Sequence, residues 1–150
     1  MGDENEEKEV GGMLNRLELL QPDPFKIEKV CFDKGQFIYV REMSGRERDR
    51  FEQSLMLEVQ GPQGKVDYKR NMSDFRAKLA VCTICDADGK LLLTQADIPT
   101  LSQNKSAAKL EKILEVSQKL NKITEEDKEA MVKNSDGAQA DNSTSPSVEN

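Results

Sequence analysis

Two cysteines three positions apart are the side chains in this sequence with the clearest potential for chemistry. Cys82 and Cys85 form a C-x-x-C pair, a spacing used by redox-active dithiols and by zinc sites. A redox pair needs an exposed helix N-terminus, whereas this pair follows an apolar segment. A four-ligand zinc site would need a carboxylate, because Cys31 is the only other cysteine and the chain has no histidine. The spacing therefore predicts two buried structural thiols.

A second pattern that suggests chemistry is the acidic run DADG at residues 86–89. Calcium-binding EF-hand loops use closely spaced aspartates, but they also need Gly at the sixth position and Glu at the twelfth. Counted from Asp86, those positions hold Leu91 and Asp97, and Gly89 comes two residues early. The sequence therefore favours a hairpin turn over a calcium site.

Three arginines, Arg46, Arg48 and Arg50, alternate with acidic residues. A row of arginines would suit an anion site, but interleaved acids are typical of a solvated helix face. The chain has no histidine, which is the commonest general base, and no glycine-rich phosphate-binding motif. We therefore expect a protein that is not an enzyme and that binds no cofactor and no metal ion.

The net charge of −6 is concentrated at the two ends of the chain. Residues 1–9 carry five acids and one lysine, residues 134–150 carry three acids and no base, and residues 10–133 carry 21 bases and 20 acids. Low hydrophobicity and like charges predict a disordered acidic leader at 1–12 and a disordered polar tail at 135–150. The residues between them, 13–134, are expected to form a single domain.

A nearly neutral body lacks the basic surface that nucleic acid binding requires, so no nucleic acid partner is expected. The apolar runs are too short to cross a membrane, and the acidic N-terminus is unlike a secretory signal. We therefore expect a cytoplasmic protein without a membrane partner.

The segment DFRAKLAVCTICDADGKLLL at residues 74–93 is expected to lie at the centre of the fold. Phe75, Leu79 and Cys82 share one face of a helix, and the neighbouring face is apolar as well, which predicts burial on more than one side. The DADG turn then leads to the run LLL, which is expected to pair back as a short second hairpin.

Before this segment, periodicity and turn residues predict four stretches. Residues 13–20 have the leucine spacing of a short amphipathic helix. Residues 27–42 alternate as a β-hairpin around the turn DKGQ. Residues 45–57 are expected to form a helix that begins with the capping box SGRE, and residues 61–72 a polar, basic loop.

After this segment, three helices are expected, at residues 94–101, 106–120 and 124–133. The central helix itself is expected to be capped by Ser73 or Asp74. Together the elements predict an α+β, mainly helical fold, with an N-terminal β-hairpin followed by a small helical bundle with a short second hairpin.

The run YVREMSGRERDRFE at residues 39–52 resembles the hairpin-to-helix transition of the tail assembly chaperones of long-tailed phages. The resemblance resumes in the runs RAKL, DADGK, KSAA and TEED, and ends at Asn134. These runs follow the order of the family and together span residues 37–134. The sequence departs from the family in its leader and in Cys82 and Cys85, which stand where aliphatic residues are usual.

The resemblance implies a protein that coats the tape measure protein, helps the tail tube to assemble around it, and is absent from the mature virion. It also implies a longer frameshifted product that recruits the tail tube protein, and a location in the host cell cytoplasm if the chain is phage-encoded. An oligomer is left open. The alternative interpretation is a generic bacterial protein-interaction or adaptor domain without catalytic activity.

An apolar helix face and two arginines are the candidate partner-binding residues, namely Leu110, Ile113, Leu114, Arg46 and Arg50. A long tape measure chain exposes apolar surface that the amphipathic helices of a small, abundant partner can cover. The alternative is that the apolar face of the helix at 106–120 belongs to the core of the domain.

Overall fold

The apolar segment at residues 74–93 forms the buried helix that its sequence predicts, α3 (Phe75–Thr83). The structure, a computed structural model, describes residues 11–123 and residue 127. Six side chains of this nine-residue helix are buried, which is more than one helical face can hold. Helix α3 therefore needs cover from several neighbouring elements.

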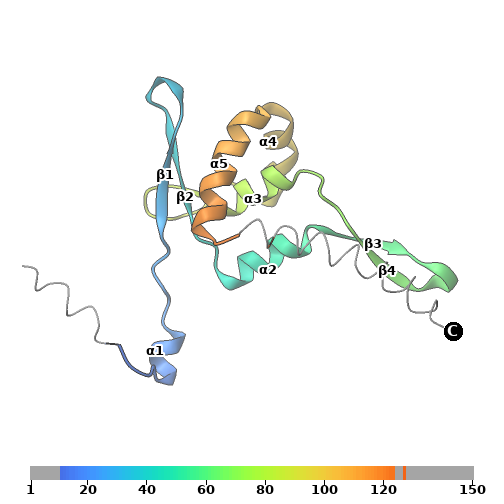
Figure 1. Ribbon diagram of the computed structural model, residues 1–150, viewed down its shortest axis with the longest axis horizontal. Helices are drawn as coiled ribbons and strands as arrows, with labels where there is room; N and C mark the ends of the chain where they lie inside the picture. Colours follow the sequence, from blue (N-terminus) through green and yellow to red (C-terminus); the bar gives the residue numbers. More distant parts are fainter. Residues whose placement is uncertain (1–10, 124–126, 128–150) are drawn as a thin grey trace, which may run out of the picture.

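The other elements surround α3 or extend away from it (Figure 1). The described helices are α1 (Arg16–Leu20), α2 (Gly45–Gln53), α4 (Ile98–Asn104) and α5 (Ala107–Leu120). The strands are β1 (Ile27–Cys31), β2 (Phe37–Arg41), β3 (Met56–Gln60), β4 (Val66–Arg70) and β5 (Ile84–Cys85). The expected α+β fold, with an N-terminal β-hairpin followed by helices, is confirmed.

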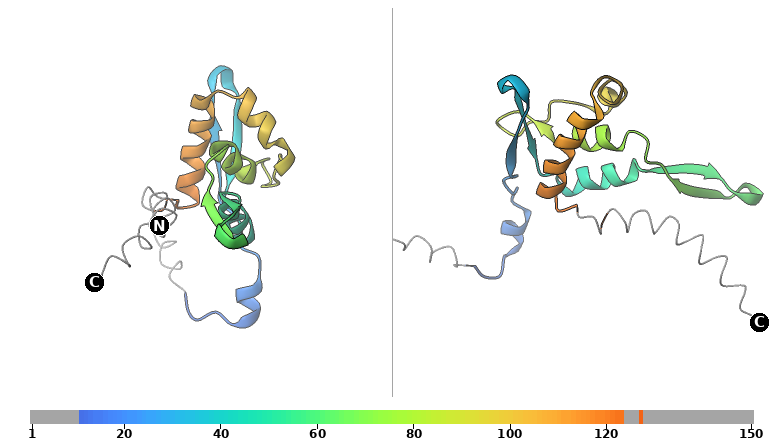
Figure 2. Two further views of the ribbon diagram at one scale, coloured as in Figure 1. Left: turned by 90° about the vertical axis from the view of Figure 1, so that its right-hand side faces the viewer. Right: turned by 45° about the horizontal axis from the view of Figure 1, so that its top comes forward.

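The body of the protein consists of a small sheet and the helices packed on it. Strands β1, β2 and β5 form an antiparallel sheet in the order β1-β2-β5. Helix α5 packs against β1 and β2, and α3 contacts α2, α4 and α5. Figure 2 shows α1 and the β3–β4 hairpin extending away from this body at separate places.

A pair of buried hydroxyls joins α3 to α5. The Oγ1 of Thr83 and the Oγ of Ser117 lie 2.9 Å apart, and both residues are fully buried. Because the Thr83 hydroxyl lies 2.9 Å from the Leu79 carbonyl and donates to it, the Ser117 hydroxyl donates to Thr83. Each polar group in this contact therefore has a partner, which burial demands.

The N-terminal hairpin has the predicted turn. Its register runs from Ile27 opposite Arg41 to Cys31 opposite Phe37. The central turn residues Lys34 and Gly35 have φ of 61° and 72°, the left-handed values that a type I′ turn requires. The register leaves residues 32–36 as the connection, which the Phe32 amide closes by donating to the Gln36 carbonyl over 2.7 Å.

The expected helix at 45–57 and loop at 61–72 are wrong in part. Helix α2 ends at Gln53, where the Ser54 amide donates to the Arg50 carbonyl, and β3 and β4 then form a second antiparallel hairpin. Its turn residues Gln63 and Gly64 again have positive φ, 60° and 76°. The alternation of apolar and charged residues in this stretch is a strand signal that its high charge obscured.

The expectations about the central segment are confirmed in part. Residues 91–93 form no continuous strand, but the segment pairs back on β5 as predicted, through a bridge between Leu91 and Cys85 and a hydrogen bond of 3.1 Å from the Leu92 amide to the Ile84 carbonyl. The other edge of β5 pairs with β2. The DADG turn itself is confirmed, with the Gly89 amide donating to the Asp86 carbonyl over 3.0 Å. Asp74 holds the N-cap position of α3 with a φ of 59°, yet its carboxylate accepts from the Ser102 hydroxyl rather than from an α3 amide.

The remaining described helices are confirmed with shifted ends. Helix α1 begins after an Asn15 cap, and α4 continues to Asn104 instead of ending at residue 101. Helix α5 has the predicted length and a Ser106 cap. The helix expected at 124–133 lies outside the described residues except for Asp127, which is helical.

The disorder expected for the leader and the tail concerns residues that the structure leaves undescribed, apart from residues 11 and 12. These two are exposed and belong to no helix or strand. Both expectations stay predictions.

A charged cluster joins the end of β2 to the start of α2. The predicted capping box is present: the Ser44 amide donates to Glu47 Oε1 over 2.8 Å, and the Glu47 amide donates to Ser44 Oγ over 3.2 Å. The buried Arg41 binds the other oxygen, Oε2, over 2.8 Å. Burial alone would raise the pKa of Glu47, but the Ser44 amide and the Arg41 guanidinium together hold that pKa below its usual value.

Replacing Glu47 by Gln is expected to lower the free energy of unfolding by about 1–3 kcal/mol at neutral pH, since buried Arg41 loses its charged partner. A carboxylate with a lowered folded-state pKa contributes stability above its ordinary pKa of 4.5 and loses it as the pH falls through the folded-state value. Urea denaturation at several pH values should therefore show the difference between wild type and Glu47→Gln shrinking below pH 4.5.

The matched control is Glu52→Gln, because Glu52 forms an exposed i,i+4 pair with Arg48. This change should alter the free energy of unfolding by no more than about 0.5 kcal/mol. Equal effects of the two substitutions would contradict a special role for the Arg41–Glu47 pair.

Candidate functional site

The two cysteines of the C-x-x-C pair are buried, as their sequence context predicts. Cys82 lies in the last turn of α3 and packs in the same core cluster as Leu114. Cys85 lies in β5. Burial raises the pKa of the Cys82 thiol to about 11 and also raises the pKa of Cys85. Because the thiolate is the nucleophile and the metal ligand, these thiols are held in their unreactive form.

The described residues contain no group of three or more histidine, cysteine, aspartate or glutamate side chains placed to hold a metal ion. Asp86 uses one carboxylate oxygen to accept from the amides of Asp88 and Lys90, over 2.8 Å and 3.0 Å. The Lys90 and Asp88 amides keep the pKa of Asp86 below its usual value. That carboxylate therefore stabilises the turn.

The candidate partner-binding leucines and isoleucine belong to the core. Leu110 and Ile113 pack with the sheet residues Val30 and Val40, and Leu114 packs with Phe51 and others around Cys82. This burial agrees with the alternative interpretation of the α5 face. Partner binding by these three side chains is not tested by the structure and stays a prediction.

The candidate arginines lie elsewhere, on α2. Arg46 and Arg50 are exposed, whereas Arg48 pairs with Glu52 and also donates to the Asn121 carbonyl over 3.1 Å. The two arginines therefore lie on a different helix from the three candidate residues of α5. Of the five candidate residues, Arg46 and Arg50 are the exposed ones.

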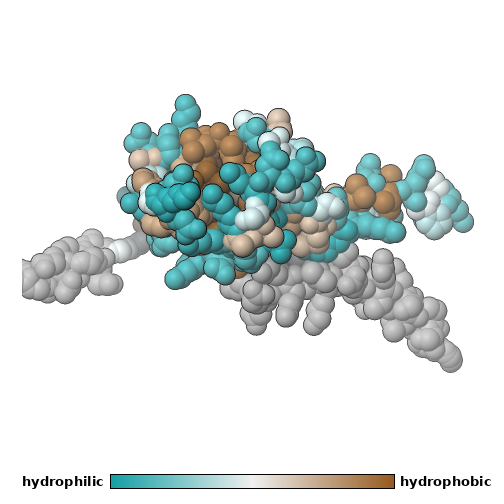
Figure 3. Space-filling view, turned by 90° about the horizontal axis from the view of Figure 1, so that it is seen from above, coloured by the Kyte–Doolittle hydropathy of each residue, from teal (hydrophilic) through white to brown (hydrophobic). Residues whose placement is uncertain are grey.

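An apolar groove opens at the turn end of the β1–β2 hairpin. It has a volume of about 590 Å³ and lies between this hairpin, the segment after β5, and the facing ends of α4 and α5. Its apolar lining includes Phe32, Phe37, Ile38, Leu92, Leu93 and Leu101. Figure 3 shows apolar residues gathered on this side of the body between hydrophilic borders.

Lysines form the border of the groove. Lys105 and Lys109 line it, and Lys34 and Lys112 lie on the adjoining surface. The Nζ atoms of Lys109 and Lys112 stand 4.7 Å and 5.9 Å from the centre of the Phe32 ring. Cation–π contacts of this kind place positive charge directly beside apolar surface.

The β3–β4 hairpin carries a second apolar surface. Val66 and Tyr68 are 58% and 57% exposed, and Met56 and Leu57 are about half exposed. This hairpin is a separate two-stranded sheet that projects from the body (Figure 1), and within the described chain it has no third strand. Figure 3 shows its apolar atoms as a distinct patch on the projecting ribbon.

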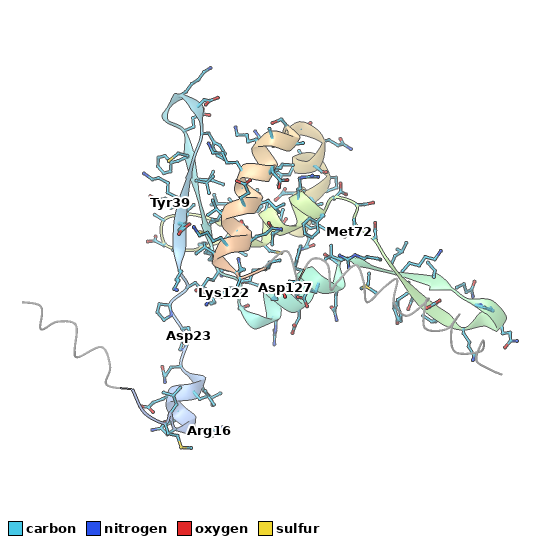
Figure 4. All side chains as sticks on the ribbon, in the orientation of Figure 1. Arg16, Asp23, Tyr39, Met72, Lys122 and Asp127 are labelled. Atoms are coloured by element: carbon cyan, nitrogen blue, oxygen red, sulfur yellow. The ribbon has the colours of Figure 1, made fainter. Side chains whose placement is uncertain are left out.

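The third apolar surface is α1, which no sequence reasoning identified as unpartnered. Leu17 and Leu20 are 68% and 64% exposed, and α1 has no buried residue. Figure 4 places Arg16 well away from the body, with Asp23 on the segment that connects α1 to it. Leucine spacing predicted a short amphipathic helix, and such helices usually bury their apolar face, which α1 does not do.

No described helix is long and apolar enough to cross a membrane.

No protein-family model matches this chain, and no curated protein matches it. Among solved structures, the fold is similar to that of the bacteriophage HK97 tail assembly chaperone, with a TM-score of 0.46 and 13% sequence identity. The similarity covers 80% of this chain and 95% of that chain. A likeness of this extent leaves the function to be argued from the surfaces of the chain itself.

Thiol alkylation of the native protein at pH 8 is expected to modify Cys31 quickly and Cys82 and Cys85 slowly, because only Cys31 is exposed. A thiol with a raised folded-state pKa contributes stability below its ordinary pKa of 9.0 and loses it as the pH rises toward 11. The free energy of unfolding should therefore fall across this alkaline range. Mass spectrometry of labelled peptides and urea titrations measure the two effects.

The matched control is the Cys82→Ala variant, which should lose most of the alkaline dependence. Labelling of all three cysteines at one rate in the folded protein would show that the pair is not buried.

Proposed function

We propose that this chain is a phage tail assembly chaperone that coats the tape measure protein in the host cytoplasm. In this proposal it helps the tail tube assemble around that protein and is absent from the mature virion. The observation that carries the proposal is the apolar surface of the β3–β4 hairpin, which the fold holds outside its own core.

The hairpin is physically incomplete by itself. An isolated two-stranded ribbon is only marginally stable in water, and exposed apolar side chains add nothing to its stability until something covers them. Its base is held by the Asn71 amide, which donates to the Leu55 carbonyl over 2.6 Å. Since Leu55 is buried in the core, the ribbon has a fixed root and a free apolar length.

Both faces of the ribbon offer apolar side chains. In its antiparallel register Met56, Tyr68 and Val66 share one face, and Leu57 and Val59 share the other. A ribbon with apolar groups on both faces can lie between two turns or two helices of a long client. This suits a tape measure protein, whose extended apolar surface needs many small binders along its length.

The charges around the hairpin are mixed. Glu58 lies on β3, Asp67, Lys69 and Arg70 lie on β4, and Lys65 comes just before β4. The apolar contacts therefore carry the binding in this proposal, and the exposed Arg46 and Arg50 of the neighbouring α2 add a charged border. The resemblance of residues 37–134 to the tail assembly chaperones supports the same client, and recruitment of tail tube protein by a longer frameshifted product belongs to the proposal.

Co-expression with the cognate tape measure protein is expected to keep that protein soluble, with several copies of this chain purified per client. Because the contacts are apolar, moderate salt should weaken the complex little. The measurements are client solubility with and without this chain and the stoichiometry of the purified complex. A client that is equally soluble alone, or that never co-purifies, would favour the adaptor interpretation instead.

Acidic substitutions on the hairpin are expected to abolish this coating. Leu57→Asp and Tyr68→Asp place a charge on opposite faces of the ribbon, where client contact would have to desolvate it. Gln103→Asp adds the same charge on the exposed surface of α4 and is the matched control. Pull-down of the client measures binding, and slow labelling of Cys82 verifies that each variant is folded.

Full coating by both hairpin variants would show that another surface binds the client. Loss of coating by the α4 control as well would point to a general effect of charge.

A further inference from the structure

Two apolar surfaces of this chain match each other in chemistry, the helix α1 and the apolar groove. Leu17 and Leu20 lie three positions apart on α1 and are exposed, so they form a small apolar ridge. The groove is lined by apolar side chains and is open to solvent at the opposite end of the β1–β2 hairpin. Both surfaces would gain from burial, yet within the chain they do not meet.

The connection between α1 and β1 prevents the helix from reaching the groove of its own chain. Lys26 is fastened to the end of β2, because its amide donates to Glu42 Oε1 over 2.8 Å and its carbonyl accepts from the Glu42 amide over 3.0 Å. The Arg41 guanidinium stands 4.8 Å from the centre of the Phe25 ring and holds this residue as well. Only residues 21–24 remain as a free spacer.

That spacer is short and stiff. Its sequence is QPDP, and each proline fixes its own φ and keeps the residue before it extended. Four extended residues span about 12 Å. The groove begins at Phe32, and the five strand steps from Ile27 cover about 17 Å in the direction away from α1. A second molecule, by contrast, can bring its α1 to the groove without strain.

Charge supports the same pairing. Lys105 and Lys109 line the groove, with Lys112 and Lys34 on the adjoining surface. The sequence places five acids and one lysine in residues 1–9, ahead of α1, whereas α1 itself carries one charge of each sign, Arg16 and Glu18. An arm seated in the groove would therefore bring an acidic segment to a lysine border.

We propose that α1 of one molecule docks in the apolar groove of a second copy of this chain, with Leu17 and Leu20 as the anchoring side chains. Such a contact is heterologous, because it joins two different surfaces, and it produces closed rings or open chains of molecules. It is a property of the chain alone and goes beyond the proposed coating function.

The experiment uses two full-length variants, each of which lacks one half of the contact. The arm variant carries Leu17→Asp and Leu20→Asp and keeps its groove. The groove variant carries Leu92→Asp, a substitution at a half-exposed residue, and keeps its arm. Sedimentation velocity should show assemblies for the wild type that grow with concentration, and monomers for each variant alone.

An equimolar mixture of the two variants is the decisive sample. The groove of one variant and the arm of the other restore a single contact, so the mixture should form a one-to-one dimer and nothing larger. Leu57→Asp on the β3–β4 hairpin is the matched control, since it is a leucine-to-aspartate change at similar exposure outside both surfaces. This control should assemble as the wild type does, even if it has lost client coating.

The salt dependence of assembly tests the contribution of charge. Raising the salt concentration should weaken wild-type assembly, roughly tenfold between low and high salt, because screening shortens the reach of the lysine border. A chain that begins at Met13 should assemble more weakly and lose most of this salt dependence.

Several results would overturn the proposal. A wild type that remains monomeric at every concentration would exclude docking into a second copy. This is also the result expected if α1 docked in the groove of its own chain. Variants that assemble as well as the wild type, or a mixture that stays monomeric, would do the same. None of these samples contains the tape measure protein, so the outcome is independent of the test of coating.

Discussion

The burial of α3 on more than one side is the constraint on which the rest of the structure depends. A helix that is apolar nearly all round gains its stability only when other elements cover each of its faces. Helices α2, α4 and α5 and the sheet supply this cover. The Thr83–Ser117 hydroxyl pair fits the same requirement, since a polar group at the centre of such a core must find its partner there.

Covering α3 uses most of the apolar residues of the body and leaves three groups of them outside. The β3–β4 hairpin, α1 and the apolar groove have side chains of the same kind as the core but no neighbour on the exposed side. Hydrophobic surface of this extent on a small protein is typical of association. The physical division between a satisfied core and unsatisfied extensions therefore underlies both proposals, one concerning a client and the other a second copy.

The residues that looked most reactive have structural roles. Burial keeps Cys82 and Cys85 protonated, and the Asp86 carboxylate is occupied by two amides of its own turn. Glu47 closes a capping box and binds Arg41. In each case the polar or nucleophilic atom serves the local fold.

Features that depend on near neighbours were determined by the sequence alone. The Ser44 capping box, the turn at Lys34 and Gly35, and the apolar stripe of α5 all arise from contacts within a few positions along the chain. The buried central helix was predicted for a similar reason, because its apolar residues fill more than one helical face. These signals were sufficient for the fold class and for the N-terminal hairpin.

Which surfaces are covered was decided only by the tertiary structure. From the sequence, the apolar stripe containing Leu110 and Leu114 fits a binding face as well as a core face. It belongs to the core because Val30, Phe51 and other residues distant in the sequence pack against it. The same holds for Leu17, whose spacing predicts a helix but not that the helix stands clear of the body. Strand β5 pairs with Leu91 on one edge, as the DADG turn predicts, but its pairing with β2 on the other edge joins residues far apart in the sequence. Burial depends on what lies opposite a side chain, and local sequence carries no record of that.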